Sequence, residues 1–574
     1  MVKLVINGRQ IEVKEHTTIL EAAKISGIHI PRLCYLKELN EVAACRICLV
    51  EIEGVDKLMA SCNTECEEGM VVRTDTKAVR EARRTNLELI FSQHRTQCLS
   101  CVRDGNCSLQ EVAKEFNMTR PVEEVDPRPN RWKAGRILER DNSKCIQCFR
   151  CINVCDKVQS LSVWDLLGTG KNSRVGINPS KKHFHEICAL CGQCITHCPT
   201  GALYVKDDTE RFYDAVHDPD IITVVQVAPA VRSAYGEAAG LPRELATEGR
   251  MAAAIKSLGV DYVFDTNFSA DLTIMEEGTE LLKYLGERET KLPMFTSCCP
   301  GWVRYMKIKH PDMVSQLSSA KSPQQMFGAV TKSYFAKMIG VDPAKICCIS
   351  IMPCTAKKYE CDVPEVQDAS VDGGFKDVDM VLTTRELTRI LRPVDLASLE
   401  EIPFDSPLGA GTGAAVIFGR TGGVMEAALR SAAFLVEGKN PDTATFKKYN
   451  HPENCWTEAA YEIGGTTVRT AVVSGLANAG KLIDSIRSGK TEVDFVEVMA
   501  CPGGCAGGGG QPIHDGLELA YDRGEVLDSI DGNANIRYSH ENPEIIKLYA
   551  DYLGEPLSET AHHLLHTDQT EWTL

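Results

Sequence analysis

The sequence predicts a multidomain protein in which small α+β modules precede a larger α/β region. The chain has 574 residues, whereas a single hydrophobic core stops growing at roughly 250–300 residues. Its cysteines gather in short runs through the first 208 residues. After Pro219, strand-like runs such as 222–225 alternate with helical patterns, which is typical of an α/β fold.

Composition and charge exclude several classes of protein. Hydrophobic residues make up 43% of the chain and charged residues 25%, as in ordinary globular proteins. The net charge of −16 disfavours nucleic acid, whose phosphates need basic patches. No apolar run reaches the roughly 18 residues that span a bilayer. The first eight residues predict a strand and turn rather than an export signal. We therefore expect a cytoplasmic protein that binds neither nucleic acid nor membrane.

The 25 cysteines favour metal ligation over disulfides. Disulfides are expected in secreted chains, but here the cysteines stand at ligand spacings and no export signal precedes them. Their runs divide the chain into predicted domains. The boundaries are 1–78, 79–120, a linker rich in Pro, Arg and Glu at 121–138, 139–208, and 209–574.

The first domain alternates short apolar strands with turns and holds four spaced cysteines. They are Cys34, Cys45, Cys48 and Cys62. Four thiolates on loops beside strands suit a [2Fe-2S] cluster, although the first gap is longer than in plant-type ferredoxins. Structural zinc is the alternative. Cys66 lies nearby and is interpreted as a spare thiol.

The second domain begins with a helical pattern and then places one histidine before three cysteines. They are His94, Cys98, Cys101 and Cys107. By spacing alone this set fits zinc as well as a [4Fe-4S] cluster. The flanking modules favour the cluster. A neutral imidazole in place of a thiolate would change the cluster's net charge and its reduction potential.

The third domain contains an internal repeat with the spacing of two-cluster bacterial ferredoxins. In that pattern the fourth cysteine of each run ligates the other cluster. One predicted [4Fe-4S] cluster therefore takes Cys145, Cys148, Cys151 and Cys198, and the other takes Cys155, Cys188, Cys191 and Cys194. Zinc is disfavoured because it usually takes two separated cysteine pairs.

Three phrases in the last domain carry a family resemblance. They are Thr296-Ser297-Cys298-Cys299-Pro300, Met352-Pro353-Cys354 and Cys501-Pro502-Gly503-Gly504-Cys505. Their order and separations resemble the three signatures of [FeFe]-hydrogenases. The upstream modules resemble the accessory domains of the large clostridial type, so the resemblance covers essentially the whole chain. It implies ferredoxin-like modules followed by a two-lobed α/β H-cluster domain.

The resemblance implies an H-cluster and the reaction 2H⁺ + 2e⁻ ⇌ H₂. By motif position, Cys299, Cys354, Cys501 and Cys505 would hold a [4Fe-4S] cubane. Cys505 would bridge to a two-iron unit with CO, cyanide and azadithiolate ligands. Maturation proteins would install that unit. From the residues themselves, glycines at 503, 504 and 507–510 would let the backbone approach a bulky cofactor and adopt positive φ.

The resemblance also implies roles for residues beside the cluster ligands. Cys298 resembles the thiol that relays protons, a role for which a buried inert cysteine is the ordinary alternative. Glu277 and Glu280 share a helix face at i and i+3. Without the resemblance they would be interpreted as a solvated face, and with it they carry protons outward together with Ser318.

Further positions resemble the pocket around the two-iron unit. Lys357 would donate to a cyanide ligand. The remaining predicted cofactor-binding residues are Ala228, Pro229, Ala230, Gln324, Met352, Pro353 and Met499.

Rival functions are weighed by what the sequence contains. A pure electron-transfer subunit, like the large iron–sulfur subunit of complex I, would lack the three phrases of the last domain. A sensory relative tends to lose the relay thiol or carboxylates, which are present here. The remaining question is the electron partner. The glycine-rich loop at 409–414 follows Pro407 rather than a clear strand, so it does not predict a nucleotide site. The ending at 561–567 and the first module favour the catalytic subunit of an NAD(P)-linked or bifurcating complex, with flavin-binding partners, over a stand-alone ferredoxin enzyme.

Overall fold

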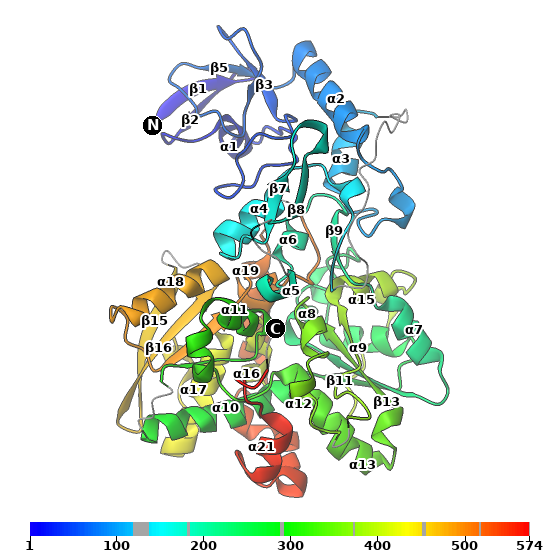
Figure 1. The fold of residues 1–574 in the computed structure, drawn as a ribbon, viewed down its shortest axis with the longest axis vertical. Helices are drawn as coiled ribbons and strands as arrows, with labels where there is room; N and C mark the ends of the chain where they lie inside the picture. The colour runs from blue at the N-terminus through cyan, green and yellow to red at the C-terminus, as the bar shows by residue number, and fades with distance from the viewer. Residues whose placement is uncertain are drawn as a thin grey trace. The chain divides into compact units, whose positions relative to one another are not determined.

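The computed structural model describes residues 1–118, 137–178, 180, 184–287, 292–370, 373–449, 455–515 and 518–572 (Figure 1). The predicted linker at 121–138 lies outside the described residues except for its last two positions. The chain divides into two compact units. Unit 1 comprises 1–157, 162–182 and 197–206, and unit 2 comprises 158–161, 183–196 and 207–574.

Unit 1 begins with a sheet in the order β2-β1-β5-β3-β4. The predicted first strand and turn are present, because Asn7 and Gly8 both have positive φ, as a tight hairpin turn requires. Strand β5 pairs in parallel with β1, whereas β2 and β3 join the sheet antiparallel. The strands are β1 Val2–Ile6, β2 Arg9–Val13, β3 Leu49–Ile52, β4 Met59–Ala60 and β5 Val71–Arg73.

The rest of unit 1 consists of short elements separated by the cysteine runs. The predicted helical start of the second domain is α2, whose first turn is capped by the Thr76 hydroxyl. The helices are α1 Ile19–Ile25, α2 Lys77–Phe91, α3 Ser108–Glu115 and α4 Arg150–Asn153. Two antiparallel strand pairs follow, β6 Leu138–Arg140 with β9 Leu203–Val205, and β7 Trp164–Leu167 with β8 Arg174–Ile177.

Unit 2 has the predicted α/β character. One of its sheets is parallel throughout, in the order β11-β10-β13-β14. Its strands are rich in Val and Ile and are buried along most of their length, as parallel strands between helices require. The bounds are β10 Ile222–Val227, β11 Tyr262–Asp265, β13 Ile346–Met352 and β14 Met380–Thr383.

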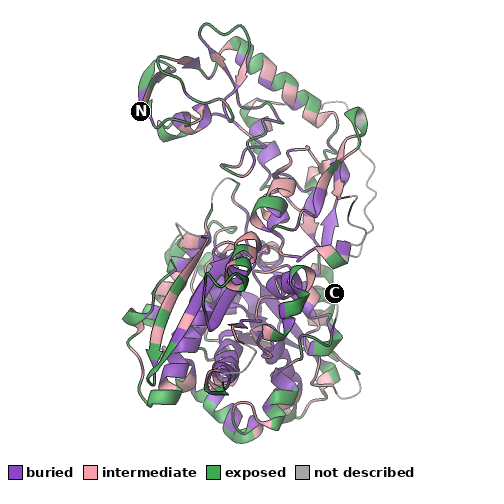
Figure 2. Ribbon diagram, turned by 60° about the vertical axis from the view of Figure 1, so that its left-hand side comes forward, coloured by how far each residue is buried: buried purple, intermediate pink, exposed green. Residues whose placement is uncertain are grey.

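Another sheet of unit 2 has the order β12-β17-β16-β15. Strands β12, β17 and β16 are parallel, and β15 closes the edge as an antiparallel hairpin with β16. The alternating exposure of β15 contrasts with the fully buried β17, as expected for an edge beside a core strand (Figure 2). The bounds are β12 Met294–Phe295, β15 Trp456–Ile463, β16 Thr466–Ser474 and β17 Phe495–Met499.

Helix α10 (Asn267–Glu287) is central to unit 2 because it packs against α17 (Gly423–Glu437) and α12 (Pro323–Val330). Most of its residues are buried, including three glutamates. Other helices of this unit are α5 Phe184–Ile187, α6 Gln193–Thr196, α7 Thr209–His217, α8 Pro229–Arg232, α9 Glu248–Lys256, α11 Pro300–Lys309, α13 Ala336–Ile339, α14 Lys357–Glu360, α15 Thr384–Ile390, α16 Gly413–Val416, α18 Leu476–Arg487, α19 Ala520–Asn533, α20 Pro543–Leu548 and α21 Glu559–Leu565. Within the described ranges, no helix has the length and apolarity needed to cross a membrane.

Candidate functional site

The family phrases lie where parallel strands of unit 2 end. Strands β10 and β13 pair in parallel, so Ala228, which follows β10, and Pro353, which follows β13, stand at one edge of their sheet. The N–H of Ala228 donates to the carbonyl of Ile351 at 3.0 Å, which fixes the two chain segments side by side. Carboxyl ends of parallel strands are the usual place for ligands in α/β proteins.

The other sheet repeats the arrangement. Strands β12 and β17 are parallel neighbours, and the phrases containing Cys299 and Cys501 follow them directly. Cys299 immediately precedes α11, which begins with Pro300 at the position where a helix needs no N–H donor. Each sheet therefore delivers predicted cluster ligands from its carboxyl edge.

The four predicted cubane ligands come together in unit 2. Burial raises the pKa of the Cys505 thiol well above its ordinary value, and Cys299, Cys354 and Cys501 raise it further. Burial likewise raises the pKa of Cys354 to about 12, with Cys299 contributing. In the absence of metal, burial and mutual repulsion therefore disfavour the thiolate form of these cysteines. Positively charged iron would stabilise the thiolates, so the group fits a metal cluster. Within the described residues, which include every cysteine, no disulfide forms.

Glycines shape the backbone beside Cys505. Gly503 and Gly504 have φ of 75° and 77°, as the sequence predicts. A Cβ on Gly504 would lie 2.7 Å from the N atom of Thr421, so a larger residue would clash there. The prediction of positive φ for the run 507–510 is wrong, because none of these four glycines has positive φ, and Gly508 has φ of −60°. The space at Gly508 is needed instead because a Cβ there would lie 2.2 Å from the carbonyl oxygen of Pro353.

The partly exposed Cys298 and the buried Glu277 are neighbouring proton-carrying groups. Burial raises the pKa of Cys298 well above its ordinary value, and the charge of Glu277 raises it further. The Glu277 side chain is wholly buried in α10, and the nearby Ser318 hydroxyl and Ser297 backbone only partly offset the cost of charging it. Burial, followed by the charge of Glu280, raises the pKa of Glu277 to about 8. Glu277 is therefore largely protonated at neutral pH.

Glu280 lies one turn further along α10 and is held by hydroxyl groups. Ser318 Oγ donates to its Oε2 at 2.8 Å. Ser318 is positioned by its backbone N–H, which donates to the carbonyl of Phe295 in β12 at 2.8 Å. The helix spacing thus brings Glu277 and Glu280 to one side of α10, as the i, i+3 pattern predicts. The solvated face that their polarity suggests is not what the structure contains, since both are buried.

Lys357 begins α14 and its side chain is buried beside Cys298. Its Nζ donates to the Cys298 carbonyl at 3.1 Å and pairs with Glu360 Oε2 at 2.7 Å. Burial opposes the charge on Lys357, but the Glu360 carboxylate outweighs it and raises the pKa of the ammonium group. Gln324 Nε2 donates to the Lys357 carbonyl at 3.3 Å, while Gln324 Oε1 has no hydrogen-bond partner among the described residues.

The other predicted pocket residues are buried in the same unit. Ala230, Met352 and Met499 are each at most 3% exposed. The carbonyl of Ala230 accepts from Gln511 Nε2 at 2.8 Å, and the carbonyl of Pro353 accepts from the Gly510 N–H at 2.7 Å. Pro229 begins α8, directly after the strand end at Ala228.

Sequence reasoning missed Glu360 and Gln511. Glu360 compensates the buried charge of Lys357, and the Lys-x-x-Glu spacing of a helix turn was a usable signal for it. No local pattern indicates Gln511, because its partner Ala230 is 281 residues away in the sequence.

In unit 1, the first four predicted ligands are close neighbours. The thiol of Cys34 interacts with that of Cys45, and the thiol of Cys48 with that of Cys62. The interaction raises the pKa of Cys34 and lowers that of Cys45 to about 6. In the same way, the pKa of Cys62 is raised and that of Cys48 is lowered. Burial raises the pKa of Cys66 to about 11.

In the predicted His/Cys₃ set, burial and then the neighbouring Cys101 raise the pKa of Cys107, with backbone N–H groups acting in the opposite direction. Cys107 Sγ lies 3.7 Å from the Pro199 carbonyl oxygen. His94 is 7% exposed, and its ring meets that of Phe91 at 6.2 Å edge to face. These contacts place the histidine in the interior but leave its ligation a prediction.

A cavity in unit 1 is lined by the sulfur ligands predicted for one ferredoxin-type cluster. They are Cys145, Cys148, Cys151 and Cys198. The cavity wall is otherwise mostly apolar, which suits a cluster shielded from water.

The second ferredoxin-type run lies largely in unit 2. The N–H of Leu190 donates to Cys188 Sγ at 3.4 Å. In unit 1, the N–H of Val163 donates to Cys155 Sγ at the same distance. Hydrogen bonds to cysteine sulfur are one of the means by which proteins set cluster potentials.

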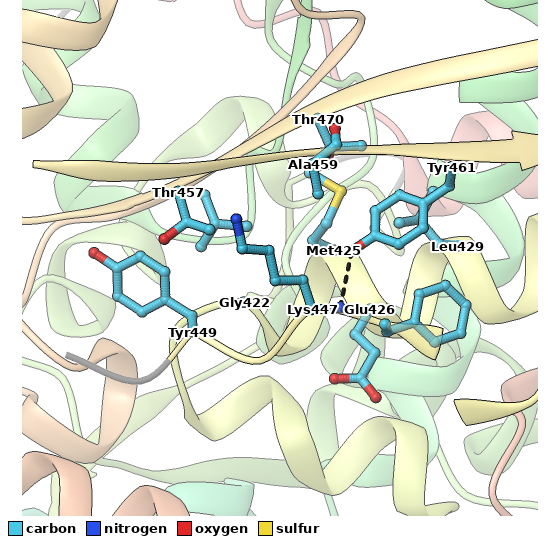
Figure 3. Close-up of a pocket in the computed structure, with 12 residues that line it drawn as sticks. Gly422, Met425, Glu426, Leu429, Lys447, Tyr449, Thr457, Ala459, Tyr461 and Thr470 are labelled. Atoms are coloured by element: carbon cyan, nitrogen blue, oxygen red, sulfur yellow. Dashed lines mark hydrogen bonds between the residues drawn. The ribbon is translucent and has the colours of Figure 1, made fainter. Parts of the chain in front are cut away.

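Unit 2 also contains a cavity, which lies between α17 and the β15–β16 hairpin (Figure 3). Glu426 reaches its wall, but this carboxylate is paired with Arg420 and Arg430. Tyr461 and Lys447 close another side, where the Lys447 N–H donates to the Tyr461 hydroxyl at 3.0 Å. The predicted site residues do not line this cavity, so it is separate from the convergence of thiols.

Comparisons with known families agree with this arrangement of modules. Residues 221–509 match the model described as "Iron only hydrogenase large subunit, C-terminal domain". The remaining matches are a 2Fe-2S iron-sulfur cluster binding domain at 1–77, an NADH-ubiquinone oxidoreductase-G iron-sulfur binding region at 83–121, a 4Fe-4S dicluster domain at 144–202 and an iron hydrogenase small subunit at 518–571.

Individual relatives resemble the chain over its whole length. The "NADP-reducing hydrogenase subunit HndD" of Solidesulfovibrio fructosivorans is 44% identical over 99% of this chain and 98% of its own. "Iron hydrogenase 1" of Clostridium pasteurianum is 37% identical over 99% of both chains. Among solved structures, a variant of the [FeFe]-hydrogenase HydA1 from Chlamydomonas reinhardtii is 40% identical with a TM-score of 0.57, covering 63% of this chain and 98% of its own. The chain therefore belongs to the [FeFe]-hydrogenase family, as an iron-only hydrogenase large subunit with accessory iron–sulfur domains that acts on H₂.

Proposed function

We propose that the chain interconverts protons and H₂ at an H-cluster whose cubane is held by Cys299, Cys354, Cys501 and Cys505. The observation that carries this proposal is the meeting of four desolvated thiols, of which Cys501 is buried and three are partly exposed, at the carboxyl ends of parallel strands, with Cys298 beside them. When bound, the two-iron unit supplies the redox chemistry, and Cys505 is the proposed bridge to it. Ala228, Pro229, Ala230, Gln324, Met352, Pro353 and Met499 are the proposed walls of its pocket.

Protons are proposed to travel through Cys298, Glu277, Ser318 and Glu280. A relay group must be able to gain and lose a proton near the working pH. Glu277 meets this condition, because its pKa of about 8 leaves it protonated at neutral pH but able to ionise. Ser318 donates to Glu280 and can pass a proton by accepting one from the other side. Lys357 orients the Cys298 segment through the Cys298 carbonyl and is the proposed donor to a cyanide ligand.

Electrons are proposed to travel through four accessory clusters. These are a [2Fe-2S] cluster on Cys34, Cys45, Cys48 and Cys62, a [4Fe-4S] cluster on His94 and three cysteines, and the two ferredoxin-type [4Fe-4S] clusters. The support is the close grouping of the first four thiols and the cavity lined by Cys145, Cys148, Cys151 and Cys198. The corresponding domain boundaries are 1–78, 79–120, 139–208 and 209–574.

We further propose that the chain is the catalytic subunit of a cytoplasmic complex whose flavin-containing partners use NAD(P). The support is the full-length similarity to a relative named as an NADP-reducing hydrogenase subunit. The alternative is a stand-alone enzyme served by ferredoxin, and a relative named without reference to a subunit, iron hydrogenase 1, matches the chain equally completely. Purification from the native host distinguishes them, since stoichiometric flavin-containing chains are expected in the first case only.

The hydrogenase activity is tested most simply by isotope exchange, which needs no electron partner. Protein from a host with the maturation proteins is placed under D₂ in ordinary water, and HD is measured by mass spectrometry. We expect steady HD formation from the wild type and a loss of at least about 100-fold from Cys298→Ala, since a proton relay contributes about 10²–10⁴-fold. Protein from a host without the maturation proteins is the matched control. HD formation at equal rates in both preparations would reject the proposal.

A further inference from the structure

The proposed proton route does not end at Glu280, because a second serine continues it. Ser319 Oγ lies 2.8 Å from Glu280 Oε1 and also 2.8 Å from Nδ1 of His566. Ser319 is partly exposed, whereas Glu280 and His566 are each 3% exposed. One hydroxyl group therefore stands between a buried carboxylate and a buried imidazole.

The backbone holds His566 firmly in this position. His566 follows α21 and forms an antiparallel bridge with Ala320. The Thr567 N–H donates to the Ser319 carbonyl at 2.8 Å, and the Lys321 N–H donates to the Leu565 carbonyl at the same distance. The contact between Ser319 and His566 thus results from a short strand-like pairing and not from a flexible side chain.

The far side of the imidazole is fixed by a second glutamate of α10. His566 Nε2 lies 2.9 Å from Glu276 Oε2, and both side chains are completely buried. Glu276 also accepts from the Tyr549 hydroxyl and from the Leu557 N–H. Since Nε2 is engaged by Glu276, the ring is oriented with Nδ1 toward Ser319.

Other polar and charged groups complete the surroundings of His566. His562 lies one turn earlier on α21 and is exposed. Its ring stacks on the ring of His566, with the two ring centroids 5.0 Å apart. Burial lowers the pKa of His562, and the charge of the exposed Lys283 of α10 lowers it further. Lys321 Nζ donates to the Leu564 carbonyl. Tyr284 donates to Glu280 Oε1 at 2.8 Å. Among these groups, the imidazole of His566 and the carboxylate of Glu280 are the ionisable groups in contact with the Ser319 hydroxyl.

The shared hydroxyl couples the protonation of its two neighbours. A serine hydroxyl carries one proton and can donate it in one direction at a time. If it donates to the Glu280 carboxylate, His566 must carry its proton on Nδ1 and donate to Ser319. If it donates to His566 Nδ1, Glu280 must be protonated and donate to Ser319. The two arrangements differ by the transfer of one proton between Glu280 and His566.

We propose that His566 is a proton-loading residue at the outer end of the relay, coupled to Glu280 through Ser319 and oriented by Glu276. In the outward step the Glu280 O–H bond breaks as a new O–H bond forms on Ser319. The original Ser319 O–H bond breaks as an N–H bond forms on His566 Nδ1, so one proton moves and no electrons are exchanged. Partial exposure of Ser319 gives this end of the relay access to water. The inference rests on the proposed route through Glu280.

The coupling can be measured without hydrogenase activity. Hydrogen–deuterium exchange at the imidazole carbon, followed by mass spectrometry of peptides across the pH range, gives the titration midpoint of each histidine in the folded protein. A carboxylate on the other side of the shared hydroxyl group favours the imidazolium form, so Glu280→Gln should lower the midpoint of His566 by at least about one unit, because opposite charges this close interact strongly in a buried site. His563, exposed on the same helix, is the internal control and should not move. An unchanged midpoint for His566 would overturn the proposal.

Turnover gives the second test. His566→Gln keeps a polar side chain but cannot load a proton, whereas His563→Gln makes the same change at an exposed position. We expect His566→Gln to keep its iron and to lose about three- to tenfold in HD formation near neutral pH, less than a relay group in contact with the reaction contributes. Its pH profile should also differ from that of His563→Gln. Identical profiles would overturn the proposal.

A further pair of variants covers the case in which His566→Gln fails to fold. Ser319→Ala removes the shared hydroxyl while leaving the pair of His566 and Glu276 intact, and it should show the same loss. Ser319→Thr retains the hydroxyl and should restore the rate; equal rates in the two variants would count against the coupling. A slow Glu280→Gln with a normal Ser319→Ala would overturn this inference alone, whereas normal rates in both would also overturn the proposed route.

Discussion

Glu277→Gln is expected to lower turnover while raising relative stability at alkaline pH, so its effect on activity cannot be mistaken for a loss of folding. The side chain is completely buried, and the Ser318 hydroxyl and Ser297 backbone beside it only partly offset the cost of charging it. Glutamine has nearly the shape of the protonated glutamate but cannot release a proton. We therefore expect the variant to fold, to lose turnover by about 100-fold or more, as removal of a proton relay predicts, and to gain relative stability at alkaline pH.

The size of the stability effect follows from the pKa of Glu277. Burial raises it from 4.5 to about 8, and at about 1.4 kcal/mol per pH unit this corresponds to about 5 kcal/mol. The unfolded chain ionises first, so the wild type loses stability as the pH rises from 4.5 through 8, and the full loss is present above pH 8. Between about pH 6 and pH 9, the difference in unfolding free energy between variant and wild type should grow by about 3 kcal/mol.

The assay is denaturant unfolding of wild type, Glu277→Gln and Glu287→Gln at the two pH values. Glu287 lies on the same helix but is exposed, so its variant is the matched control and should follow the wild type. A stability difference that does not change with pH would refute the buried, protonated state of Glu277. Full turnover by Glu277→Gln would refute its place in the relay.

Four other changes test separate parts of the site. Cys298→Ser should retain cluster iron and lose at least about 100-fold in turnover, as a missing relay acid predicts, and near-normal rates would remove the thiol from the route. Glu280→Gln should lower turnover without loss of iron, measured by HD formation and iron content together. Cys505→Ala should fail to retain the two-iron unit, which would be seen as missing CO and cyanide infrared bands. His94→Cys should keep its cluster and shift one reduction potential in a redox titration, whereas undiminished iron in His94→Ala would argue against ligation.

The modular order could be predicted from the sequence because ligand spacing is a local property. The repeat that includes Cys145 and Cys198 predicts that its fourth ligand comes from the other run, and these two residues do line one cavity. The phrase around Cys354 could be placed at a strand end because a buried run precedes it, and β13 ends at Met352. Short-range patterns of this kind carry the fold class and the family.

The outer part of the relay could not be predicted, because it depends on contacts between distant segments. Ser319 and His566 are 247 residues apart, and no motif connects them. Glu277 and Glu280 resemble a solvated helix face in the sequence, and they are buried because α17 and α12 pack on α10. The glycine run at 507–510 was explained by backbone torsion, whereas Gly508 instead makes room for the Pro353 carbonyl. In each case the role of the residue depends on contacts with segments far away in the sequence, which local patterns do not contain.

The most direct test of the central claim is an infrared spectrum of the protein purified from a host with the maturation proteins. The four thiols of Cys299, Cys354, Cys501 and Cys505 are expected to hold a cluster bearing CO and cyanide, so the spectrum should contain their stretching bands and change when argon is replaced by H₂. Cys505→Ala, prepared in parallel, should lack the bands. A wild-type spectrum without these bands, or an undiminished spectrum from Cys505→Ala, would contradict the proposed site.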